Sequence, residues 1–115
     1  VFMKNKKAGR VAQSRLKLAK TFVDNGDRTA FYKEVITALL GYLSDKLNIS
    51  QGKLDRQKAK EGLAAKKVED ELVNKWLDLM NRCEYAQFAP GGGDEELSNV
   101  YDETAQLIGE FEKAL

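Results

Sequence analysis

RTAFYKEVITALLGYLSDKL, residues 28–47, is the most apolar stretch of this chain and decides its fold. Its large apolar residues recur at spacings of three and four, the period of an α-helix. They are Phe31, Tyr32, Val35, Ile36, Leu39, Leu40, Leu43 and Leu47. The stripe is broad, so we expect a central helix that contacts neighbours on more than one side. Just before it, Gly26 can end a preceding helix in the left-handed conformation, and Asp27 can cap the new one.

The same period predicts further helices on both sides of this stretch. We expect one helix over residues 8–24, a short helix capped by Asp55 that runs to about residue 66, and another starting near Glu69. The helix from Glu69 carries Trp76 and Cys83 on its apolar stripe and extends toward Phe88.

A last helix, capped by Asp94, is expected to run to the end of the chain. Pro90 and the glycines at 91–93 precede it and predict a flexible connector. No segment alternates with a period of two, which would indicate a strand. The predicted fold class is therefore all-α: a compact bundle of about five helices without a sheet, in a single domain over residues 1–115.

Charge is unevenly distributed along the chain. Residues 1–67 hold 16 Lys or Arg and 6 Asp or Glu, and residues 68–115 hold 3 and 12, so a net charge of +1 divides into +10 and −9. Either the two halves pack together and offset each other, or a basic face is turned toward an acidic partner or an anionic lipid surface.

The composition removes most catalytic and metal chemistry. The chain has no histidine, and therefore no Ser-His or Cys-His pair. With a single cysteine it forms neither an intrachain disulfide nor a structural zinc site. Cys83 lies on an apolar stripe, where we expect a buried and unreactive thiol. We predict no catalytic residue, no metal and no cofactor, and a protein that is not an enzyme.

Residues 1–7, VFMKNKK, are interpreted as a basic tail. Lys4, Lys6, Lys7 and Arg10 would suit the cytoplasmic flank of a transmembrane helix by the positive-inside rule, and a solvated terminal tail is the alternative. Because the chain begins Val1-Phe2-Met3, we expect it to be excised from a longer membrane protein. It has no apolar run of 18 or more residues, so we expect the fragment itself to be soluble.

Several motifs resemble the C-terminal cytoplasmic region of the BatD family, bacterial proteins named for an aerotolerance operon. The matching stretches are 15–20 (RLKLAK), 31–35 (FYKEV), 38–49 (ALLGYLSDKLNI), 83–90 (CEYAQFAP) and 101–108. The resemblance implies a parent with a signal peptide, extracytoplasmic β-rich domains and one membrane-spanning helix just before this segment. It places the segment on the cytoplasmic face of the bacterial inner membrane and implies no enzymatic activity. It also implies partners among inner-membrane proteins with von Willebrand factor A-type domains.

Three functions follow as hypotheses. The first is a helical protein-interaction module that helps assemble a complex linked to aerotolerance, oxidative stress or envelope stress. The second is nucleic-acid binding through the basic half, which the sequence pI of about 7.9 and the acidic half disfavour. The third is a purely structural cytoplasmic cap. For the first, exposed aromatic side chains would mark the contact surface, and the candidates are Tyr85, Phe88, Tyr42 and Trp76.

Overall fold

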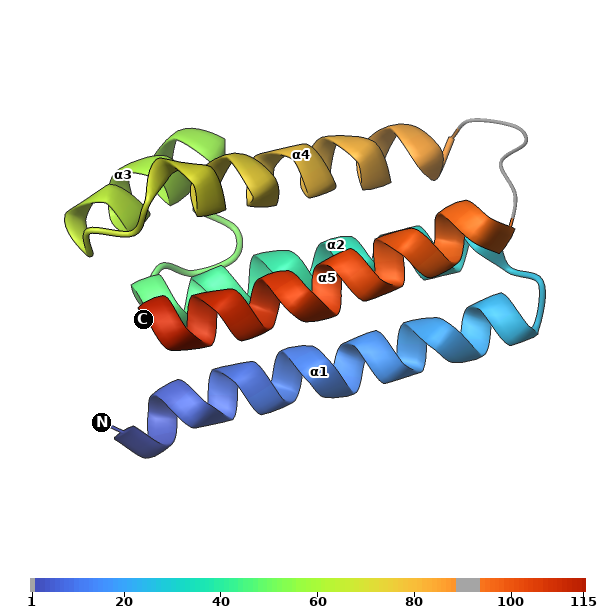
Figure 1. Ribbon diagram of the computed structural model, residues 1–115, viewed down its shortest axis with the longest axis horizontal. Coiled ribbons are helices and arrows are strands. Elements are labelled where there is room, and N and C mark those ends of the chain that lie inside the picture. Colours follow the sequence, from blue (N-terminus) through green and yellow to red (C-terminus); the bar gives the residue numbers. More distant parts are fainter. Residues whose placement is uncertain (1, 89–93) are drawn as a thin grey trace.

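The predicted helices are all present in the computed structural model of the protein. It describes the backbone of residues 2–88 and 94–115 and the side chains of residues 8–88 and 95–115. The helices are α1 (Phe2–Asp24), α2 (Arg28–Leu47), α3 (Arg56–Ala65), α4 (Asp70–Ala86) and α5 (Asp94–Ala114). They pack into a bundle of 39 × 26 × 24 Å (Figure 1). The described residues contain no strand, which confirms the all-α fold class.

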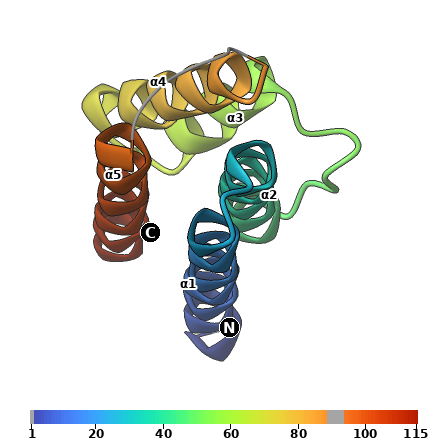
Figure 2. The ribbon, with the colours of Figure 1, turned by 90° about the vertical axis from the view of Figure 1, so that its right-hand side faces the viewer.

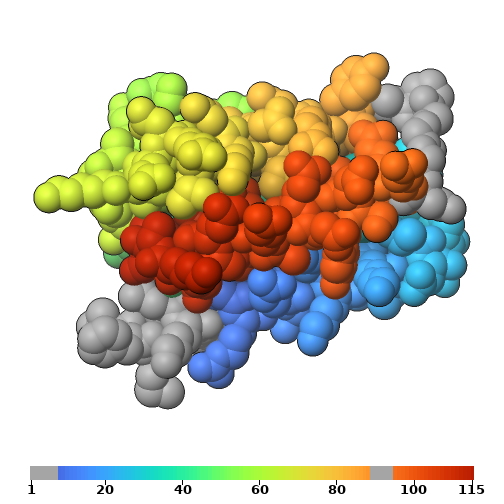
Figure 3. Space-filling view, in the orientation of Figure 1, coloured from blue at the N-terminus to red at the C-terminus, as the bar shows by residue number. Residues whose placement is uncertain are grey.

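Helix α2 is the centre of the bundle, as its broad apolar stripe predicts. It contacts all four other helices, and its packing against α1 is the most extensive in the molecule. Helices α1 and α4 lie on opposite sides of the bundle, and within the described residues they share no contact (Figure 2). On the face shown in Figure 3, α5 lies between α4 and α1. The molecule therefore presents α1 and α4 as two separate outer surfaces.

The caps that begin α2 and α3 are those the sequence predicts. Gly26 adopts φ +77°, and the Asp27 carboxylate accepts a hydrogen bond from the backbone N–H of Ala30 at 3.1 Å. Asp55 accepts in the same way from the N–H of Lys58 at 2.8 Å. Each carboxylate satisfies a backbone donor that has no partner within the first turn of its helix.

Three helix ends differ from prediction. Helix α1 begins at Phe2 and not near residue 8, so residues 2–7, interpreted from the sequence as a basic tail, are helical backbone. The segment Lys4-Asn5-Lys6-Lys7 contains no residue that stops a helix, and lysine is a good helix former. Helix α3 ends at Ala65 because Lys67 adopts φ +62°, and α4 ends at Ala86, before Phe88.

Two predictions fall outside the described residues: the connector at 90–93 and the cap formed by the Asp94 side chain. Over the residues that are described, no helix combines the length and apolarity needed to cross a bilayer.

The oppositely charged halves of the chain are joined by ion pairs. Lys46 Nζ lies 2.8 Å from Glu112 Oε2, and Arg56 pairs with Glu84. Helix α1 takes little part in this compensation, since Arg15 with Glu34 at 3.2 Å is its one ion pair among the described side chains. Part of the basic charge is therefore offset within the fold, whereas α1 keeps a basic outer surface.

Candidate functional site

The four aromatic residues predicted to mark a contact surface divide into two pairs. Tyr42 and Trp76 are buried, with 2% and 1% of their surface exposed, so the prediction that they contact a partner was wrong. The physical reason is the central position of α2. Its Tyr42 ring packs on Phe111 of α5, and its Leu39 carbonyl accepts a hydrogen bond from the Trp76 indole of α4 at 3.4 Å.

Tyr85 and Phe88 are the exposed pair. They have 76% and 79% of their surface in solvent, and both lie at the C-terminal end of α4. The backbone that carries them is held in place: the N–H of Phe88 donates to the carbonyl of Tyr85 at 3.2 Å. The Thr29 hydroxyl, at the start of α2, donates to the carbonyl of Gln87 at 3.3 Å. Two large aromatic side chains are thus presented to solvent from an anchored helix end.

Large apolar side chains are exposed at two places in the described part of the chain. One is the end of α4, with Tyr85 and Phe88; the other is α1, with Val11 and Leu18. Single exposed apolar residues are common on soluble proteins, but adjacent aromatic ones are typical of contact surfaces. Aromatic side chains also supply much of the binding energy at protein interfaces, because they bury a large area while losing little conformational freedom.

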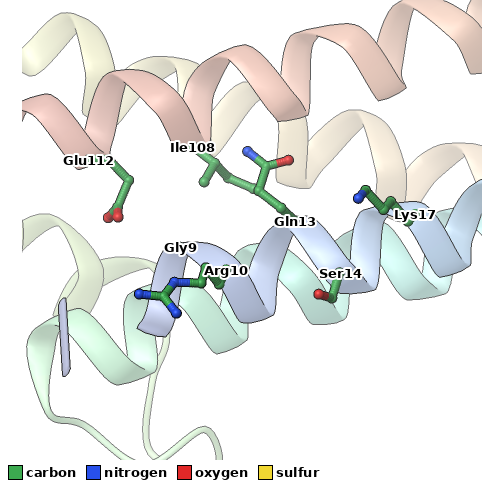
Figure 4. A pocket seen from close by; sticks show the side chains of 7 residues that line it. All are labelled: Gly9, Arg10, Gln13, Ser14, Lys17, Ile108 and Glu112. Carbon is green, nitrogen blue, oxygen red and sulfur yellow. The ribbon is translucent and has the colours of Figure 1, made fainter. Parts of the chain in front are cut away.

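The basic residues predicted to lie near a membrane are described in part. Arg10 lies on α1 and is exposed to solvent. The side chains of Lys4, Lys6 and Lys7 lie outside the described residues. Arg10 also lines a hollow of about 510 Å³ between α1 and α5 (Figure 4). Its other lining residues are Gly9, Gln13, Ser14, Lys17, Ile108 and Glu112.

At one end of this hollow lies a polar cluster that links α2 to α5. The Tyr42 hydroxyl donates to Glu112 Oε2 at 2.6 Å, and Lys46 Nζ lies 2.8 Å from the same oxygen. Burial raises the pKa of Tyr42 above its usual range, and the hydrogen bond to Glu112 raises it further. Helix α1 approaches closely here because Gly9 has no side chain: a Cβ at that position would lie 2.4 Å from Glu112 Oε1.

Reasoning from the sequence missed this cluster. Tyr42 and Lys46 are one helical turn apart and therefore share a face of α2, which is a signal that the sequence contains. Their partner Glu112 is distant in sequence, so nothing local indicates the pairing. Tyr42 and Lys46 both make polar contacts with the Glu112 carboxylate. We therefore interpret the cluster as a structural link between α2 and α5.

Cys83 is buried at 0% exposure, as the sequence predicts. Burial raises the pKa of its thiol to about 12, so the reactive thiolate is essentially absent at neutral pH. Across the side chains that the structure describes, no group of three His, Cys, Asp or Glu residues is placed to hold a metal ion.

We expect Cys83 to react with Ellman's reagent only when the protein unfolds. Because the folded pKa of about 12 exceeds the unfolded value of about 8.5, the folded state keeps its proton where the unfolded state loses it. The buried Cys83 thiol therefore makes its full contribution to the free energy of unfolding below about pH 8.5, and this contribution is lost as the pH rises toward 12. As the pH rises over this range, the free energy of unfolding should fall less for Cys83→Ala than for wild type. Urea denaturation at several pH values measures this difference. Rapid labelling of the folded protein would contradict the assignment.

No protein-family model matches this chain, and neither the curated proteins nor the solved structures show a significant match to it.

Proposed function

We propose that this chain is a helical protein-interaction domain whose contact surface is formed by Tyr85 and Phe88. The observation that carries the proposal is the exposure of both aromatic side chains, 76% and 79%, on a backbone anchored by the Thr29–Gln87 hydrogen bond. An anchored pair is preorganised, because little chain entropy remains to be lost when a partner binds. Its partner would offer an apolar pocket or groove for two rings.

The resemblance to the BatD family suggests where such a partner is found. On this proposal the domain acts on the cytoplasmic face of a bacterial inner membrane. It binds an inner-membrane protein with a von Willebrand factor A-type domain, within a complex linked to aerotolerance, oxidative stress or envelope stress. The motifs that carry the resemblance include residues 83–90, which contain both exposed aromatic residues.

We expect the double substitution Tyr85→Ala/Phe88→Ala to abolish measurable binding to the partner. Each truncation of a central aromatic side chain costs about 2 kcal/mol or more at an interface, which is roughly thirty-fold in affinity. The measurement is isothermal titration calorimetry of the purified domain against purified von Willebrand factor A-type domains of neighbouring inner-membrane proteins. Circular dichroism should show an unchanged fold, because neither side chain is part of the core.

A matched control is the double substitution Val11→Ala/Leu18→Ala, which removes exposed apolar surface from α1 instead. It should bind the partner with wild-type affinity. Wild-type affinity of the Tyr85→Ala/Phe88→Ala variant would refute the contact surface, and failure of the wild-type domain to bind any of these partners would refute the proposed partner class. In the parent protein, a normal complex at lower abundance after deletion of the domain would instead indicate a purely structural cap.

A further inference from the structure

The outer face of α1 combines cations with exposed apolar side chains. We define this face by residues 10, 11, 14, 15, 17 and 18, that is Arg10, Val11, Ser14, Arg15, Lys17 and Leu18, all of which are exposed. Val11 and Leu18 have 40% and 48% of their surface in solvent. The opposite face of the same helix is buried against the bundle through Ala8, Ala12, Leu16 and Ala19.

The register of the helix arranges these residues in lines. Val11 and Leu18 are seven residues apart, or about two turns, so they lie almost directly above one another along the helix. Arg10 and Lys17 have the same spacing and run along one side of that line, and Arg15 lies on the other side. The result is an apolar line with cations on both sides.

The charge on this face has one sign. Residues 1–23 contain no Asp or Glu, and the first acidic residue is Asp24, at the far end of α1. Arg15 pairs with the partly buried Glu34 at 3.2 Å, and within the described part of the chain Arg10 and Lys17 have no ion pair. The face therefore has an excess of positive charge and is complementary to an anionic surface.

The shape of the face favours a broad, flat occupant. Its depression, lined by Arg10, Val11, Ser14, Arg15 and Leu18, is a shallow hollow of about 400 Å³ on one convex helix. Nucleic-acid phosphates would match the cations but leave Val11 and Leu18 without apolar contact. A bilayer with anionic headgroups satisfies both, because its boundary region accepts apolar side chains beside cations.

We propose that the outer face of α1 binds an anionic lipid surface, with the helix lying flat on it. Val11 and Leu18 enter the boundary between headgroups and acyl chains, and Arg10, Arg15 and Lys17 contact headgroup phosphates. This inference does not rest on the proposed function, because the lipid-binding residues lie on α1 and the aromatic pair lies at the C-terminal end of α4 and just beyond it. These two helices do not contact each other within the described residues.

Helix α3 supplies a matched comparison within the same molecule. It also exposes several cations, including Lys58 and Lys60, but no large apolar side chain is exposed on it among the described residues. If positive charge alone determined binding, α3 and α1 would contribute alike. If the combination of cations with apolar side chains determines binding, α1 alone is required.

The test is co-sedimentation of the purified chain with vesicles of phosphatidylcholine alone and with vesicles that contain phosphatidylglycerol. Binding is expected only to the latter. Each cation near an anionic surface contributes about five-fold in partitioning, so Arg10→Gln/Lys17→Gln should lower it roughly 25-fold. Val11→Ser/Leu18→Ser should lower it roughly ten-fold with no change in charge. The control Lys58→Gln/Lys60→Gln, with the same change in net charge as the α1 pair, should have less than about a two-fold effect.

Equal losses in the α1 and α3 charge variants would overturn the proposal, because they would show dependence on net charge alone. Unchanged vesicle binding of Val11→Ser/Leu18→Ser would also overturn it. A third contradicting result would be that the wild-type chain binds a DNA duplex more tightly than it binds the anionic vesicles. The Tyr85→Ala/Phe88→Ala variant should bind vesicles like wild type, so loss of partner binding and loss of lipid binding are measured separately.

Discussion

Replacing Trp76 by alanine is expected to lower the free energy of unfolding by about 3–5 kcal/mol, the usual cost of truncating a buried aromatic side chain. Trp76 has 1% of its surface exposed and packs from α4 against the central helix α2, where its indole donates to the Leu39 carbonyl at 3.4 Å. Truncation removes the largest fully buried side chain of the described core and leaves a cavity that α2 and α4 cannot fully close. Since domains are stable by about 5–15 kcal/mol, this is a large share of the total.

Urea denaturation followed by circular dichroism measures this effect without relying on the tryptophan itself. Trp76→Phe keeps a ring in the core and should cost distinctly less than Trp76→Ala. The control Tyr85→Ala removes an aromatic side chain of 76% exposure from the same helix and should change stability by about 0.5 kcal/mol or less. A loss below about 1 kcal/mol for Trp76→Ala would contradict the packing described for α4.

The second large effect is expected for Glu112→Ala, at about 2–4 kcal/mol. This substitution removes the carboxylate that accepts from Tyr42 at 2.6 Å and pairs with Lys46 at 2.8 Å, while the Lys46 side chain remains 4% exposed. The loss should fall short of that for a fully buried pair, because the Glu112 side chain is 30% exposed and water can reach the site.

Adding Lys46→Met to Glu112→Ala should recover part of the lost stability, because the double variant has no ammonium group in the buried position. Glu110→Ala is the matched control: its carboxylate pairs with the exposed Lys75 at 3.5 Å, so the expected loss is about 1 kcal/mol or less. Urea denaturation monitored by Trp76 fluorescence measures all these variants. Equal losses for Glu110→Ala and Glu112→Ala would show that the cluster adds nothing beyond an ordinary surface ion pair.

Much of the fold follows from local signals in the sequence. The bounds of α2 were predicted to the residue, because a wide apolar stripe, Gly26 and Asp27 all indicate the same element. The end of α3 was predicted to within one residue, although the chain leaves the helix through Lys67 in a left-handed conformation that lysine seldom adopts. The start of α1 was missed because charged helix formers can continue a helix or leave it as a tail.

The candidate surfaces were harder to predict. Phe88 lies beyond the end of α4 at Ala86, where the helix period no longer separates inward from outward positions. Tyr85 lies within α4, two residues after the buried Cys83, so the helix period places it on the outward side. For Tyr42 and Trp76, the sequence shows an aromatic residue on an apolar stripe but not how many helices cover it. The cluster of Tyr42, Lys46 and Glu112 depends on contacts between distant segments, which no local pattern encodes.

Because α1 and α4 lie on opposite sides of the central helix, the thickness of the bundle separates the two proposed binding surfaces. Across the direction that separates them in Figure 1, the molecule measures 26 Å. With α1 flat on a bilayer, the aromatic pair at the C-terminal end of α4 would be held on the far side of a bundle of about that thickness, beyond the roughly 10 Å over which charged headgroups act at moderate salt. A partner could then dock without touching the lipid and without competing for it.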